Sequence, residues 1–328
     1  MPLHRPSLAP TRPAAARNGG RTGPLARTAT TVALVVTALV AVLGTGCAAS
    51  DARPPATTAP AAAAGGSSAY GSGATGGSTA ATQAAQAATR AFGAQVDTAT
   101  AAFVDAVGAL QADVAAGSTA AARSDELAAQ ADYDAFRDLE SANAVNGSTL
   151  DELSTDVGAS ESFGGLHAVE RDLWTSGPLA ADVSALAGQA PVAQFLLGRE
   201  RPGPEAIGLV AVDQLNWVVD TALPVSQEQY AHLGLVDVAA TEQAAHRSFS
   251  DIAPLAGLVD PSLTTTVTGQ FGALDAAIAA IGDPATVPDT SITPAVRLAL
   301  SRQLDATATT LARLVAALAP YGTRGAPS

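Results

Sequence analysis

The 328-residue chain has no lysine, a single cysteine and few aromatic residues. Because Cys47 is the only cysteine, an internal disulfide is excluded. All 17 basic residues are arginines, against 30 acidic residues, so the net charge is −13. Nucleic-acid binding needs a positive surface, which makes DNA or RNA an unsuitable partner. Convincing alternating strand patterns are also lacking, and this argues against a β fold.

Residues 1–46 form an arginine-containing leader without acidic residues, followed by an apolar run at 31–43. This pattern is typical of a secretory signal peptide and is too short for a membrane-spanning helix. The residues Leu43, Gly44, Thr45 and Gly46 precede Cys47 and resemble a bacterial lipoprotein box. We expect Cys47 to carry the lipid that anchors an extracytoplasmic protein to the cell membrane. A membrane-anchored helix, or a secreted protein with a free thiol, is the alternative.

Residues 47–79 are rich in Ala, Gly, Ser, Thr and Pro, and this composition predicts a flexible, lipid-anchored linker. From 80 to 322 the apolar periodicity is helical nearly throughout. We expect an all-α domain of antiparallel helical bundles with a division near residues 198–205. The predicted helices are one ending near 117 and others at 118–145, around His167, and at 206–221, 226–252, 261–282 and 293–318.

Residues 165–174, Gly-Leu-His-Ala-Val-Glu-Arg-Asp-Leu-Trp, contain the strongest functional signal. His167 and Glu170 are spaced i, i+3 in the middle of an apolar helical stripe, so both side chains point toward the core. A buried carboxylate is costly unless something pairs with it. A metal ion is one such partner, and a salt bridge is another. Carboxylate ligands with one imidazole suit iron, manganese or zinc better than copper(I).

The same ten residues resemble the His-x-x-Glu signature of the imelysin-like family, in its EfeM/EfeO branch. The block 228–232, followed by Asp237, is similar to that branch's Glu-x-Tyr-Ser-His block, and 133–136 resembles a third motif more loosely. The similarity covers roughly residues 83–321. It implies two packed four-helix bundles in an exported metal-binding lipoprotein of the short type, without a cupredoxin domain. It also implies a role in iron uptake beside a membrane permease and a haem peroxidase.

The resemblance implies metal ligands on the second helix as well, and two registers are open. In one register the family's two glutamates fall on Asp134 and Arg137, and in the other they fall on Asp138 and Glu140. The predicted metal ligands are therefore His167, Glu170, Asp134 and Glu140, with iron as the expected ion and zinc or manganese as alternatives. We expect no catalytic activity.

Two other functions compete with metal binding. In a structural or interaction module, Arg137 would replace the cation in a buried salt bridge. A metallopeptidase would need a His-Glu-x-x-His motif, whereas this helix has one histidine. Elsewhere, His232 and His246 are each expected to be packed or surface residues, and Trp174 and Trp217 to be core anchors.

Overall fold

The computed structural model describes residues 74–139, 150–153 and 163–321. The predicted signal peptide, Cys47 and Glu140 lie outside these described residues. The first helix begins at Ala74, within the stretch assigned above to the linker.

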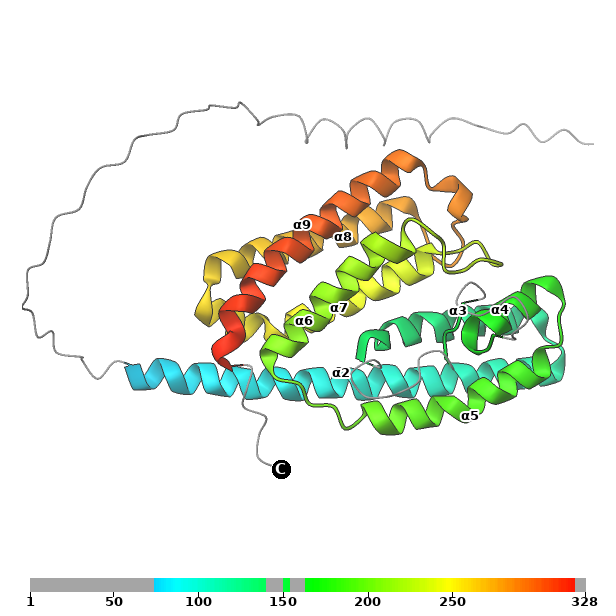
Figure 1. Ribbon diagram of the computed structural model, residues 1–328, viewed down its shortest axis with the longest axis horizontal. Coiled ribbons are helices and arrows are strands. Elements are labelled where there is room, and N and C mark those ends of the chain that lie inside the picture. Colours follow the sequence, from blue (N-terminus) through cyan, green and yellow to red (C-terminus); the bar gives the residue numbers. More distant parts are fainter. Residues whose placement is uncertain (1–73, 140–149, 154–162, 322–328) are drawn as a thin grey trace, which may run out of the picture. The chain divides into compact units, whose positions relative to one another are not determined.

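The described part of the chain is helical, and the prediction of an all-α fold is confirmed (Figure 1). Its longer helices are α2 (Ala74–Ala116), α3 (Thr119–Asp134), α4 (Gly165–Thr175), α5 (Leu179–Leu197), α6 (Pro204–Trp217), α7 (Leu235–Val259), α8 (Pro261–Ile281) and α9 (Pro294–Leu318). Shorter 3₁₀ helices lie at Arg137–Leu139, Asp289–Ser291 and Ala319–Tyr321, and a π-helical turn at Val218–Ala222 extends α6.

The eight longer helices of the described ranges pack in two groups of four. In the first group α2 packs against α3 and α5, while α4 packs against α3 and α5. In the second group α6 packs against α7 and α9, while α8 packs against the same two helices. The connection between α5 and α6 contains the predicted division (Figure 1). Helices α2 and α3 both contact α7, so the two groups meet along these elements.

By length and composition alone, α2 could cross a membrane between Thr79 and Ala116. Its buried stripe, however, includes Phe92, Phe103 and Leu110, which belong to the core shared with the neighbouring helices. A buried stripe on one side of the helix is the packing expected of a helix in a bundle.

Two helix boundaries differ from the prediction in ways that the structure explains. Helix α3 ends at Asp134 rather than near 145, and the turn that follows places Phe136 edge-on against Phe103 and Tyr133. Helix α7 begins at Leu235 rather than at 226, because His232 has a left-handed backbone (φ 58°) that a helix does not tolerate.

Helix α5 was not predicted at all. Its buried residues follow helical spacing, but its exposed positions include apolar residues such as Phe195 and Val192, so the contrast between its two faces is weak.

Candidate metal centre

The start of α4 is fixed by a short segment that precedes it in the sequence. The Leu166 amide donates to the Leu150 carbonyl oxygen at 2.7 Å, and Asp151 forms an isolated β-bridge with Gly165. Gly165 has φ 76°, and a Cβ at this position would collide with the Leu150 backbone. Glycine therefore allows the close approach that places Asp151 beside His167.

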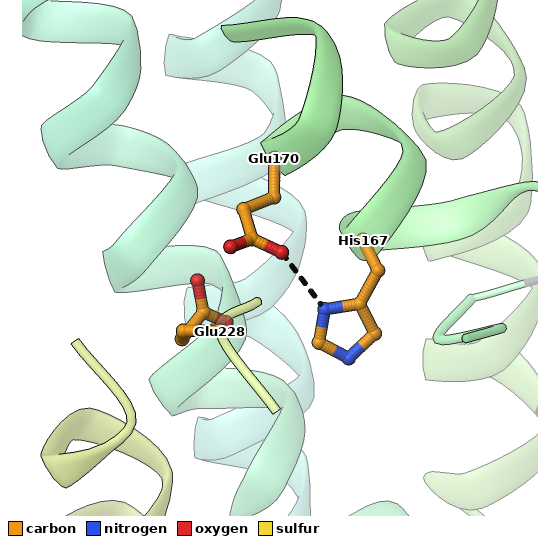
Figure 2. A group of neighbouring side chains, drawn as sticks. All are labelled: His167, Glu170 and Glu228. Carbon is orange, nitrogen blue, oxygen red and sulfur yellow. Dashed lines mark hydrogen bonds and ion pairs between the residues drawn. The ribbon is translucent and has the colours of Figure 1, made fainter. Parts of the chain in front are cut away.

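The His167 imidazole is buried between two carboxyl groups. Its Nδ1 lies 3.3 Å from Glu170 Oε2, the contact drawn in Figure 2, and its Nε2 lies 3.0 Å from Asp151 Oδ1. Burial alone would lower the pKa of His167, but Asp151 and Glu170 outweigh it and raise that pKa well above its ordinary value. Both contacts therefore favour the protonated, positively charged imidazole.

Glu170 is held by a loop from the second group of helices. Its Oε1 accepts hydrogen bonds of 2.7 Å from the backbone amides of both Tyr230 and Ala231. The same loop carries Glu228, whose carboxyl group faces that of Glu170 (Figure 2). One ligand atom from each of His167, Glu170 and Glu228 lies within 4.8 Å of the other two.

Three further carboxyl groups in this region are fully buried without a compensating partner. Both oxygens of Glu228, of Glu126 on α3 and of Asp237 on α7 lack a hydrogen-bond partner within the described part of the chain. Burial, followed by repulsion from neighbouring carboxylates, raises the pKa of each group well above its usual range.

One face of α3 points at the centre with four-residue spacing. Glu126, Gln130 and Asp134 follow one another along this face, and all three are buried. Burial raises the pKa of Asp134 to about 7, although the nearby Arg137 opposes this change. Asp134 Oδ1 contacts Arg137 Nη1 at 2.9 Å, whereas its Oδ2 has no partner among the residues described.

Arg137 does not take the place of a cation beside His167 and Glu170. Its ion pairs are with Asp134 and, at 3.5 Å, with Asp138. Its guanidinium lies 3.3 Å from the centre of the Trp217 ring. A guanidinium stacked in this way is fixed at one edge of the centre.

The charges of the centre do not balance. The described residues supply six carboxyl groups, those of Glu126, Asp134, Asp151, Glu170, Glu228 and Asp237. Within the described ranges, only His167 and Arg137 offset them. Unpaired buried carboxylates cost several kcal/mol each, so these groups must either hold protons or surround a cation.

Of the residues predicted as metal ligands, His167 and Glu170 belong to the group of three within ligand distance. Asp134 is buried nearby on α3 but is not part of that group, and Glu140 lies outside the described residues. The sequence analysis did not predict the other four carboxyl groups, those of Glu126, Asp151, Glu228 and Asp237, as ligands. Helical spacing could have identified Glu126, because it lies eight residues before Asp134 on the same face of the helix. Glu228 and Asp237 stood in a block already noted for its similarity. Nothing in the sequence connected Asp151 to α4.

No protein-family model matches this chain, and no curated protein matches it either. The similarity to the imelysin-like family thus stays a prediction.

Proposed function

We propose that this protein binds a metal ion, with iron as the leading candidate, at the centre formed by His167, Glu170 and Glu228. The observation that carries the proposal is the fully buried Glu228 carboxyl group. It has no partner within the described residues, and it faces another carboxylate and an imidazole. A cation among the three groups would supply the missing charge.

The protein groups have distinct roles in this proposal. His167 Nδ1 is the proposed ligand atom, because it is on the side of Glu170 and Glu228. Asp151 at Nε2 would accept the remaining ring proton, which is the usual carboxylate–histidine arrangement behind a metal ligand. The amides of Tyr230 and Ala231 would keep Glu170 in position. Binding requires Nδ1 to release its proton.

Oxygen ligands with one imidazole favour iron, manganese or zinc. The sequence features then suggest where the protein works. With a leader, a lipoprotein-like Cys47 and a tether, it would present the ion outside the cell membrane. By its resemblance to the imelysin-like family it would serve iron uptake without catalysis, with a permease and a haem peroxidase as partners.

Elemental analysis and calorimetry on the purified protein test this proposal. We expect saturable binding of Fe³⁺, presented as its citrate complex, or of Zn²⁺. The His167→Ala, Glu170→Gln double variant should bind the ion about 10–100-fold more weakly. The matched control is Asp105→Asn, which removes an exposed carboxylate from α2. Equal binding by the wild type and the double variant would refute this site.

A structural module is the second candidate, and the Arg137–Asp134 ion pair over Trp217 favours it. In that case protons and Arg137 satisfy the centre, and the melting temperature does not respond to any metal ion. A metal-binding centre predicts the opposite, because an ion that binds only the folded state raises its stability.

A further inference from the structure

A second group of potential ligands lies on α7 and α8. Glu242 and His246 are spaced i, i+4 on α7, so they share a helix face, and Asp275 faces them from α8. One ligand atom from each of these three residues lies within 4.8 Å of the other two. None of the three belongs to the centre around His167.

The imidazole of this group is held in place. His246 Nδ1 lies 3.2 Å from Asp275 Oδ2. The ring stacks on Phe271, with ring centres 4.7 Å apart and planes 6° from parallel. Phe271 itself is fully buried and stacks in turn on Phe249. The aromatic support limits the orientations of the imidazole, as a preorganised ligand requires.

The decisive residue is Glu242, which is 1 % exposed. Neither of its oxygens has a hydrogen-bond partner among the described residues. The carboxyl group thus lacks a fixed counter-ion at the place where a second carboxylate and an imidazole converge.

Glu242 and Asp275 also line a surface pocket of about 460 Å³ between α7, α8 and the turn that contains Pro284. The other lining side chains include Ala239 and Ala279, which are small. An ion could therefore reach Glu242 from solvent, and water could occupy the remaining coordination positions.

We propose that Glu242, His246 and Asp275 form a second cation site that takes a divalent transition metal such as Zn²⁺. Two carboxylates, one imidazole and an open position facing water are a donor set that Zn²⁺, Mn²⁺ and Fe²⁺ accept. Because His246 and Asp275 are partly exposed, the ion at this site exchanges with solvent more readily than an ion at the enclosed His167 centre.

Zn²⁺ titration of the purified protein, with elemental analysis after dialysis, tests the second site. The His246→Gln, Asp275→Asn double variant should lose about one Zn²⁺ equivalent per chain or bind it at least about tenfold more weakly. Both substitutions are at partly exposed positions, so the variant should fold, and circular dichroism checks this. Glu242→Gln keeps the shape of the buried side chain and should weaken the same site.

Two controls make the result specific. His232→Asn removes an exposed histidine at a left-handed position that asparagine tolerates, and Asp305→Asn removes an exposed carboxylate from α9. Neither should change the Zn²⁺ stoichiometry. The His167→Ala, Glu170→Gln variant should retain the second site, so failure of one site is distinguishable from failure of the other. Unchanged Zn²⁺ binding in a folded His246→Gln, Asp275→Asn variant would overturn the inference.

Discussion

Two buried regions of this molecule are filled by different kinds of side chain. Among α6–α9 the centre is mainly aliphatic and aromatic, with side chains such as Ile207, Ile252, Phe271 and Leu311 fully buried. Between α3, α4 and the start of α7, equally buried positions hold Glu126, Asp134, Glu170, Glu228 and Asp237. Both regions belong to one helical fold, so architecture alone does not require the acids.

This contrast indicates what the acids are for. Apolar residues of similar size in place of buried charges are often neutral or stabilising, whereas carboxylates without partners lower stability. A region that keeps five fully buried acids gives up stability for another property. Cation binding is the property that their geometry around His167 supports best.

The largest expected effect is a loss of folding stability from a cavity in the apolar interior of α6–α9. Leu311→Ala should lower the free energy of unfolding by about 2–5 kcal/mol, because it leaves a cavity among α6–α9. Urea denaturation measures the change, and Leu298→Ala, at an exposed position on α9, is the control with little effect. The affinity for metal at His167 should not change. A folded Leu311→Ala protein that has lost metal binding would show that the two interiors are not separable.

The next effect is the pH dependence of the metal-free protein. The pKa of Asp134 is raised to about 7, and those of Glu126, Glu228 and Asp237 are raised well above normal. Groups with raised pKa stabilise the fold fully below their unfolded values near 4, and that stability is lost as pH rises through the folded values. The raised pKa of His167 acts in the same direction above its ordinary value of 6.5.

Urea denaturation between about pH 5 and about pH 8 should therefore show a decline on the order of 1–3 kcal/mol without metal. Added metal should reduce the decline, because it replaces the protons. Asp151, whose pKa is lowered by His167 although burial opposes it, contributes in the opposite direction, and only below its ordinary value of 3.8. Stability of the metal-free protein that rises across this interval would contradict the proposed excess of buried acid.

The sequence predicted the fold class and singled out His167 and Glu170 of the buried acidic centre, and particular residues show why. Periodicity finds helices with one apolar face, such as α4, and the i, i+3 spacing then places His167 and Glu170 on the same side. It did not find α5, whose exposed positions are largely apolar or small. It also continued α3 past Asp134, because the inward turn of Phe136 depends on contacts with Phe103.

The rest of the centre depends on tertiary contacts. Glu228 reaches Glu170 because a loop donates two amides across 60 and 61 residues of sequence. Asp151 reaches His167 through a single β-bridge at a left-handed glycine. A single sequence carries no signal for either contact. The second site shows the same limit, since Asp275 meets His246 only through the pairing of α7 with α8.

A smaller effect, on metal affinity, should come from Asp151, which contacts the proposed histidine ligand on its other ring nitrogen. Asp151→Asn removes the charge that would hold the His167 Nε2 proton during metal binding, and we expect affinity about 10–100-fold weaker. Calorimetry measures this change, with Asp105→Asn as the control. An unaltered affinity would mean that Asp151 orients nothing and that His167 binds through its other nitrogen or does not bind metal.

The smallest effect tests the contrast between the two interiors most directly. Glu126→Gln preserves the shape of a fully buried side chain with no partner in the described structure, but removes its ability to ionise. Near pH 8 the metal-free variant should be more stable than the wild type by about 1 kcal/mol, because one desolvated acid is gone. Its metal affinity should fall, because the centre has lost one compensating charge. A gain in stability by urea denaturation together with a loss of affinity by calorimetry is expected only if the buried carboxyl group helps to bind a cation. Loss of both stability and affinity would instead make Glu126 a structural residue.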